Sequence, residues 1–314
     1  MHGPLVQAGY INSAAFGTAW ADATTKIPIV KESFTKEFER TSSKALTGSA
    51  AEKEFFNGRV IVGGDLEMNL DFDTNGLLEH CMGNKAGGTH TLTNVLDKWF
   101  HFQVDKYTIR HRVQSVFADG FTISGEKGSS DPVAWVVKGH AYDYTRSATA
   151  FPTLTLTEKP VRFEHLTQCW LGDQTDALAV GDAIAISAFE IAVEHNQEVD
   201  GGDSSDHAHV LAQARNGLRT VTLKLTLPRL NASAETISTW RDAGTRLQAI
   251  LKFDSGAGAD TIQFNFPDIK IEGGGDFNVD GASVLKSEIT LRAFANLHNT
   301  PMAAVTDQFN VVVV

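Results

Sequence analysis

Apolar and polar residues alternate with a period of two along most of the chain. Residues 66–72 read Leu-Glu-Met-Asn-Leu-Asp-Phe, and residues 220–227 read Thr-Val-Thr-Leu-Lys-Leu-Thr-Leu. Successive side chains of an extended strand point to opposite faces, so both segments are predicted to be half-buried strands. A core on one face and polar residues on the other are typical of antiparallel sheets.

The same reasoning predicts further strands and two short helices. The helices are Asn75–Met82 and Ala234–Ala243, each followed by a glycine that accepts the left-handed backbone of a helix C-cap. The predicted strands are Ile27–Glu39, Trp99–Val104, Tyr107–Phe117, Val133–Tyr144, Phe163–Leu171, Ile184–His195, Leu247–Phe253, Thr261–Ile271 and Val284–Phe294. The expected fold class is mainly β: antiparallel β-sandwich or half-barrel modules, each with one short helix.

The two halves of the chain repeat this order of elements. Phe189 follows Phe34 by 155 residues, and Val221 follows Leu66 by the same interval. In each half a first strand is followed by a long polar segment (40–62 and 196–219), then the alternating strand and the glycine-capped helix. A fixed long period indicates duplication. We therefore expect two tandem modules, residues 1–155 and 156–314, with their connection at about 146–182.

Composition narrows the functional classes. The chain has 314 residues, 42% hydrophobic and 21% charged, which suits two globular domains. Its net charge of −11 argues against binding nucleic acid by neutralising phosphates. The longest apolar run is far too short for a membrane helix, and the first thirty residues lack the features of a signal peptide. Two cysteines predict free thiols in a reducing cytoplasm rather than a disulfide framework.

Candidate chemistry is sparse. None of the common nucleophile, zinc or phosphate-loop motifs occurs, so we predict no catalytic residue and no cofactor. One acidic, histidine-containing stretch has the residue types that bind cations, although its spacing is not that of an EF-hand. The alternative is a solvated polar loop. The residues concerned are Asp200, Asp203, Asp206, His207 and His209.

Several motifs, in order, resemble one family. They are Phe-Gly-Thr-Ala-Trp at 16–20, Ile-Val-Lys-Glu-Ser-Phe at 29–34, Gly-Asp-Leu-Glu-Met-Asn-Leu at 64–70 followed by Gly-Leu-Leu at 76–78 and Met-Gly at 82–83, and Thr-His-Thr at 89–91. In the second half the strand at 220–227, Trp240 and the strands at 262–271 and 284–291 fit the same module. This series resembles the tail tube proteins, or major tail proteins, of long-tailed bacteriophages over nearly the whole chain.

The resemblance implies a structural virion protein that is not an enzyme. Six sandwich modules would close a ring and rings would stack into a hollow tube, so two modules per chain imply trimeric, pseudo-hexameric rings rather than hexamers. The implied partners are further copies of the chain, the tail terminator, tape-measure and distal tail proteins, and phage DNA that passes without specific binding. No membrane is involved; the protein would be made in the host cytoplasm and act in the virion tail.

A DNA channel favours a wall that does not offer lysine and arginine to phosphates. The polar sides of the two first strands carry four glutamates that we expect to face the lumen, the alternative being bulk solvent: Glu37, Glu39, Glu190 and Glu194. The long segments 40–62 and 196–219 are expected to make contacts between rings or subunits.

Other functional classes stay open at this stage. The chain could be another ring-forming tail protein, such as a terminator or distal hub component. It could also be a non-viral carbohydrate-binding β-sandwich module, although its aromatic residues, 9% of the chain, form no evident cluster. An enzyme whose site is assembled from distant loops is the remaining alternative.

Overall fold

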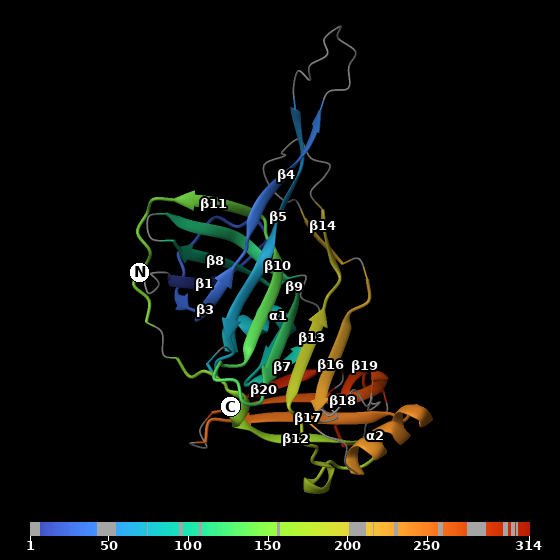
Figure 1. The fold of residues 1–314 in the computed structure, drawn as a ribbon. Helices are drawn as coiled ribbons and strands as arrows, with labels where there is room; N and C mark the ends of the chain where they lie inside the picture. Colours follow the sequence, from blue (N-terminus) through green and yellow to red (C-terminus); the bar gives the residue numbers. More distant parts are fainter. Residues whose placement is uncertain are drawn as a thin grey trace, which may run out of the picture.

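The structure is a computed structural model. It describes residues 7–314 except 43–54, 74, 94–96, 107–108, 156–157, 201–211, 216, 229–231, 257–259, 275–286, 298–300, 303–304 and 306. The described chain is mainly β with two α-helices, as the alternating pattern predicts. Figure 1 shows an upper and a lower layered unit that share one long central sheet.

The first half contains eleven strands and one helix among the described residues. They are β1 (Gln7–Ser13), β2 (Thr25–Lys26), β3 (Ile29–Glu32), β4 (Thr35–Ser42), β5 (Phe55–Asn69), α1 (Asn75–Met82), β6 (Gly83–Ala86), β7 (Thr89–Leu92), β8 (Trp99–Asp105), β9 (Arg110–Glu126), β10 (Ala134–His140) and β11 (Asp143–Ser147).

The described part of the second half contains nine strands, two short 3₁₀ helices and one α-helix. They are η2 (Phe163–His165), β12 (Leu166–Asp173), η3 (Val180–Asp182), β13 (Ala188–Glu194), β14 (Gln197–Asp200), β15 (Ala212–Arg215), β16 (Thr220–Leu227), α2 (Ala232–Ala243), β17 (Leu247–Asp254), β18 (Thr261–Gly274), β19 (Ser287–Ala293) and β20 (Asn310–Val313).

Strand pairing follows the same order in both halves. In the first, β3 and β4 pair with β5, and the sheet continues through β10, β9 and β8 to β1, with β11 on the other side of β9. In the second, β13 pairs with β16, and the sheet continues through β19, β18 and β17 to β12, with β20 on the other side of β18. The alternating strands β5 and β16 thus hold corresponding places. The division of the chain into modules 1–155 and 156–314 stays a prediction.

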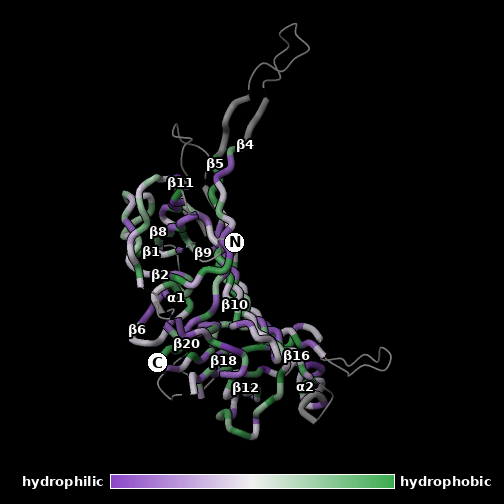
Figure 2. Tube along the Cα trace, turned by 60° about the vertical axis from the view of Figure 1, so that its left-hand side comes forward, coloured by the Kyte–Doolittle hydropathy of each residue, from purple (hydrophilic) through white to green (hydrophobic). Residues whose placement is uncertain are grey.

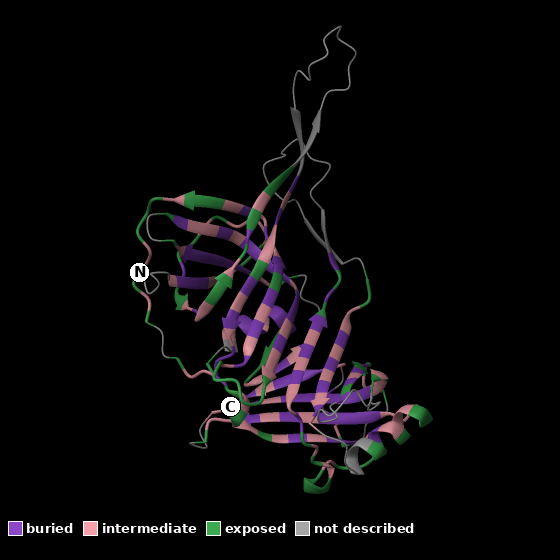
Figure 3. Cartoon of the chain, in the orientation of Figure 1, coloured by how far each residue is buried: buried purple, intermediate pink, exposed green. Residues whose placement is uncertain are grey.

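The two sheets are joined edge to edge. Strand β9 of the first half pairs with β13 of the second, so the central sheet runs β4–β5–β10–β9–β13–β16 without a break (Figure 1). Strands β12, β17 and β18 run across its lower end, and α2 lies beside them. Buried and partly exposed residues alternate along β13 and β16, so one face of the central sheet lies on the core (Figure 3).

The apolar faces form one core cluster that extends through both halves. Its largest fully buried apolar side chains include Trp135, Phe100 and Phe121 in the first half and Phe253 and Phe266 in the second. Figure 2 shows hydrophobic positions alternating with hydrophilic ones along the strands. Burial of one such aromatic side chain contributes about 1.5–3 kcal/mol relative to exposure, so the core alone couples the two halves strongly.

The C-terminal segment has a definite place that the sequence pattern does not predict. Strand β20 lies between β18 of the second half and β7 of the first, pairing with both. The amide of Val313 donates to the carbonyl of Gly88 at 2.8 Å, and Phe309 and Val311 are fully buried. The chain end therefore ties the two halves together a second time.

Several predicted elements differ in extent. The strand predicted at Ile27–Glu39 is divided into β3 and β4, and the one at Val133–Tyr144 is divided into β10 and β11. Strand β9 continues nine residues past the predicted end at Phe117. The polar segments expected to lack regular structure include strand residues: β4 and β5 extend as a hairpin beyond the rest of the sheet, and β14 pairs with β15 (Figure 1). Strands β1, β2, β6 and β20 were not predicted, whereas β7 begins at the Thr-His-Thr that resembles a strand start in the family.

Two buried histidines make the fold sensitive to acid. Burial lowers the pKa of both His80 and His90 to about 4. The unfolded chain binds these protons near pH 6.5, whereas the folded chain does not until about pH 4. Their contribution to stability is therefore complete above pH 6.5 and is lost as the pH falls towards 4, by up to about 1.4 kcal/mol per pH unit for each histidine.

We predict that the free energy of unfolding, measured in urea, falls between pH 7 and pH 5 and that the double variant His80→Gln/His90→Gln shows a shallower fall. Glu158 is exposed, so the variant Glu158→Gln is the control. Its free energy of unfolding should fall with pH as that of the parent does. An unchanged pH dependence in the double variant would contradict this assignment.

Candidate assembly surface

The junction between the two halves is an antiparallel ladder between β9 and β13. It runs from the pair Gly120–Glu194 to the pair Glu126–Ala188. At its lower end the amide of Lys127 donates to the carbonyl of Ser187 at 2.8 Å. Over the paired residues, each strand forms the edge of its own half's sheet, so the ladder covers two sheet edges that would otherwise expose unpaired backbone groups.

Glycines of β9 allow the two halves to approach closely. A Cβ atom at Gly120 would lie 2.4 Å from the carbonyl oxygen of Val193, and one at Gly125 would lie 2.9 Å from the ring of Phe189. Neither separation is compatible with a side chain. Both glycines lie beyond the end predicted for this strand, although the apolar alternation at Phe121 and Ile123 was the signal that could have extended it.

Hydrogen bonds at the end of β13 complete the junction. His195 is buried and donates through Nε2 to the carbonyl of Cys81 at the end of α1, 2.8 Å away. The amide of Gln197 donates to Oδ1 of Asp119 at 2.7 Å. Arg219, just before β16, donates to the carbonyl of Leu92 at 2.9 Å. The end of α1, Asp119 of β9 and the end of β7 therefore each make a hydrogen bond to the second half.

Strand β4 of the first half corresponds to β13, but no neighbouring strand covers its outer edge among the described residues. Phe38 in β4 and Val193 in β13 are 155 residues apart, yet Phe38 is 38% exposed and Val193 is 1% exposed. Val30, in neighbouring β3, is also exposed. Among the described residues, β3 and β4 pair with β5 alone, which leaves their outer edge open.

At the opposite end of the central sheet, β19 alone pairs with Lys270–Gly274 of β18 among the described residues, and the carbonyl of Gly274 accepts a hydrogen bond from Arg241 of α2 at 2.8 Å. Both β9 and β18 carry one extra residue opposite the adjoining strand, Asp119 and Glu272, followed by the glycines Gly120 and Gly273. A Cβ atom at Gly120 would lie 2.4 Å from the carbonyl oxygen of Val193, whereas one at Gly273 would meet no described atom within 4 Å. The sheet thus ends in two edges that correspond to the two edges already joined inside the chain.

The side of the central sheet away from the core forms a polar face. Residues directly opposite one another in an antiparallel pair point to the same face of the sheet. The strand registers therefore show which side chains lie on the polar face. Among the described residues its charged members are Glu37, Asp65, Glu67, Glu126, Glu190, Glu194 and Glu288, with Lys31, Lys138, Lys224, Lys270 and Arg292. The face is mixed in charge with a small acidic excess.

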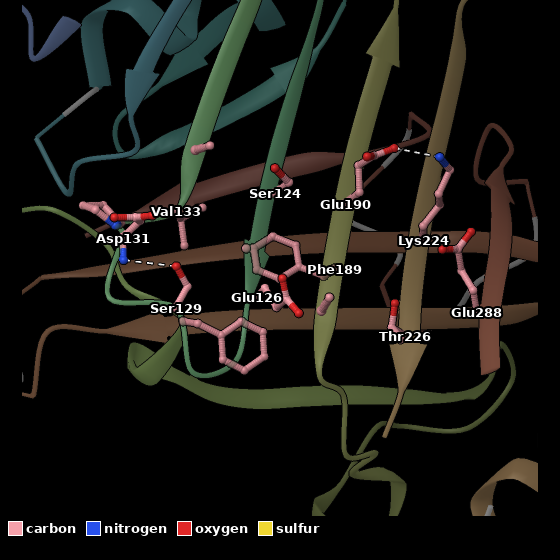
Figure 4. A pocket seen from close by; sticks show the side chains of 15 residues that line it. Ser124, Glu126, Ser129, Asp131, Val133, Phe189, Glu190, Lys224, Thr226 and Glu288 are labelled. Atoms are coloured by element: carbon pink, nitrogen blue, oxygen red, sulfur yellow. Dashed lines mark hydrogen bonds and ion pairs between the residues drawn. The ribbon is translucent and has the colours of Figure 1, made fainter. Parts of the chain in front are cut away.

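A hollow of about 400 Å³ lies on this face at the junction (Figure 4). Side chains of β9, β13, β16 and β19 line it, and Glu190 and Lys224 meet across it at 2.9 Å. That carboxylate raises the pKa of Lys224 through their hydrogen bond. The ion pair is exposed and is therefore worth about 0–1 kcal/mol.

The structure brings three of the four expected lumen glutamates to the polar face: Glu37, Glu190 and Glu194. The side chain of Glu39 lies outside the described residues. Of the three on the polar face, Glu190 is paired with Lys224.

The predicted cation-binding side chains lie outside the described residues. Asp203, Asp206, His207 and His209 lie outside the described residues, as does the side chain of Asp200 in β14. Within the part of the chain that is described, no three His, Cys, Asp or Glu side chains are placed to hold a metal ion. No described helix is long and apolar enough to span a membrane.

Comparison with known proteins identifies the family of the chain. A search of curated proteins finds no match. The family model of phage tail tube proteins matches residues 3–293, which is nearly the whole chain and includes the central sheet, both α-helices and both open edges. This agrees with the mainly β, antiparallel architecture. The chain therefore belongs to the phage tail tube protein family, as a structural component of the virion tail.

Proposed function

We propose that three copies of the chain close a pseudo-sixfold ring, that rings stack into a tube, and that genomic DNA passes through its lumen without specific binding. The observation that carries this proposal is the β9–β13 junction inside the chain. This junction is a head-to-tail contact. It joins β9, at the edge of the first half's part of the central sheet, to β13, the first strand of the second half's part.

A ring requires the same two surfaces to meet at every step around the axis. The open edge of β18 at Gly273 corresponds to the edge of β9 at Gly120, and the open edge of β3 and β4 corresponds to that of β13. Pairing β18 of one copy with β4 of the next repeats the internal junction. Closure would leave no free edge in the central sheet, and removing such edges avoids uncontrolled association.

In such a ring the polar face would line the channel. The opposite face of the central sheet is covered by the core and by the second layer of strands, so the polar face is the one left for the inside. Its lysines alternate with acidic residues, for example Lys224 beside Glu190, instead of forming a basic stripe. A wall of this kind gives DNA no row of cations for counterion release, so DNA can slide through it.

The two projecting hairpins suit contacts between rings. The β4–β5 hairpin and the β14–β15 hairpin extend towards the same end of the central sheet (Figure 1). We assign stacking to this end and to the segments 40–62 and 196–219. Tail terminator, tape-measure and distal tail proteins would meet the terminal rings or the lumen, and the chain would be synthesised in the host cytoplasm.

The first test adds a side chain at the open edge of β18. Gly273→Val should leave the isolated chain folded, because no atom of the described residues lies within 4 Å of the new Cβ atom. It should prevent ring formation, because the corresponding Cβ at Gly120 would lie 2.4 Å from a carbonyl of the joined strand. Analytical ultracentrifugation reports the mass, and circular dichroism reports the fold.

The matched control is Gly181→Val in η3, which also meets nothing within 4 Å and lies away from both sheet edges. It should assemble as the parent does. Rings of normal mass from Gly273→Val would refute the proposed pairing.

The second test removes Gly201–His209 from the segment between β14 and β15. The sheet registers do not involve these residues, so the shortened chain should still fold and form rings. Stacking should be impaired, seen as shorter tubes by negative-stain microscopy. Tubes of unchanged length and stability would contradict a stacking role for this segment.

The third test reverses the proposed lumen charge. Replacing Glu37, Glu39, Glu190 and Glu194 with lysine should permit assembly, since the described members of this set lie on the face away from the core. DNA should be retained in variant tails at low salt and released at high salt, because phosphate contacts weaken steeply with ionic strength. DNA ejection at the parental rate at low salt would exclude these residues from the channel wall.

A further inference from the structure

We propose that Arg241 caps the open edge of β18 in the free chain and is displaced when β4 of the next copy pairs with that edge. This inference rests on the proposed ring and adds a control step to its assembly. It follows from a hydrogen bond between α2 and the end of β18, at a position that the first half fills with strand β13.

The cap is a charged donor held on a backbone acceptor. Nη1 of Arg241, in the last turn of α2, donates to the carbonyl of Gly274 at 2.8 Å. Nε and Nη2 of the same guanidinium each lie 3.0 Å from Oδ1 of Asp242, the next residue of the helix. The guanidinium is planar, with its donors in a fixed arrangement. The carboxylate of Asp242 therefore orients the group while its third nitrogen reaches the strand.

The first half shows what this strand position does when its partner is present. The amide of His195 donates to the carbonyl of Asp119 at 2.7 Å. In an antiparallel ladder, every second pair of residues exchanges hydrogen bonds. The register between β9 and β13 continues without a shift, so the next such pair is Phe121 with Val193. The carbonyl of Phe121 therefore faces β13.

Gly274 holds the position in β18 that corresponds to Phe121 in β9. Each lies two residues after the extra residue of its strand, Glu272 in β18 and Asp119 in β9. The carbonyl of Gly274 is thus the acceptor that an incoming strand needs. A side chain on this residue cannot block the edge, because φ is +81° and a Cβ atom would collide with the carbonyl of Glu288. A donor from the neighbouring helix can cover the acceptor instead.

The two helices differ as this assignment requires. Helix α1 packs against β9, and α2 packs against β18. Each helix is followed by a glycine with positive φ, Gly83 and Gly244. The residues three positions before these glycines are His80 and Arg241. His80 is buried, and its Nε2 atom lies 2.8 Å from Oδ1 of Asn12 in β1. The matching side chain therefore lies in the core where the edge is joined, and caps the strand where the edge is open.

The cap makes assembly depend on concentration without preventing it. An open strand edge is a template for pairing with any other chain, so covering it limits association of free chains. When β4 of the next copy arrives, its amide replaces Arg241 as the donor to Gly274, and the remaining bonds of the ladder are gained. Arg241 keeps its contact with Asp242, so its displacement leaves no charge unpaired.

The test removes the donors of the cap. Arg241→Met keeps an unbranched side chain that suits a helix but has no donor. It should lower several-fold the concentration needed for half-maximal ring formation, measured by analytical ultracentrifugation. Arg241→Lys keeps a cationic donor and should stay near the parental value. The matched control is Arg162→Met, which removes the same charge from an exposed side chain before η2, away from both edges.

Asp242→Asn is the second variant, and it decides the question if Arg241→Met does not fold. It removes the carboxylate that orients Arg241, so the concentration needed should fall in the same direction by a smaller factor. A parental or higher concentration for Arg241→Met, or for Asp242→Asn where only that protein folds, would overturn the cap and leave the ring proposal intact. Failure of the parent to form rings, or normal rings from Gly273→Val, would overturn the junction and the cap with it.

Discussion

The main-chain ladder between β9 and β13 is the contact on which the rest of the structure depends. A sheet edge carries a row of unpaired donors and acceptors and has to be paired or covered. The chain satisfies one such pair of edges internally, by joining the last inner strand of its first half to the first strand of its second. Gly120 makes this possible because a side chain there would collide with Val193. The corresponding outer edges, at β4 and at Gly273, are left open in the described chain.

The internal junction also explains which parts of the two halves are buried. Equivalent residues differ in exposure according to whether a neighbour is present, as Phe38 and Val193 show. Helix α1 packs against β9, β6 and β7 and accepts a hydrogen bond from His195 of the second half, whereas α2 exposes Glu235, Thr239 and Asp242. The C-terminal strand β20 adds a second tie by pairing with β7. Two connections hold the halves at one relative orientation, which suits a preformed segment of a ring.

A single polar face results from this geometry. Strands β13 and β16 alternate with a period of two, and the registers align their polar positions with those of the neighbouring strands β9, β10 and β19. Acidic and basic residues are interspersed on it, and some are paired, as are Glu190 and Lys224. For a phage tail tube protein such a face is suited to a channel because it offers phosphates no continuous line of cations.

The sequence by itself determined the local structure and the family. The alternation at 66–72 and 220–227, the glycine caps after α1 and α2, and the 155-residue spacing predicted antiparallel strands, two short helices and a repeated order, because these features depend on the near neighbours of each residue. The partner of each strand edge was decided only in the tertiary structure. Three features depend on residues that are distant in the chain: the pairing of β9 with β13, the place of β20 between β18 and β7, and the close approach at Gly120. Side-chain periodicity identifies a strand but does not indicate which other strand its backbone will pair with. For the same reason the glutamates could be assigned to a polar face, but the pairing of Glu190 with Lys224 could not.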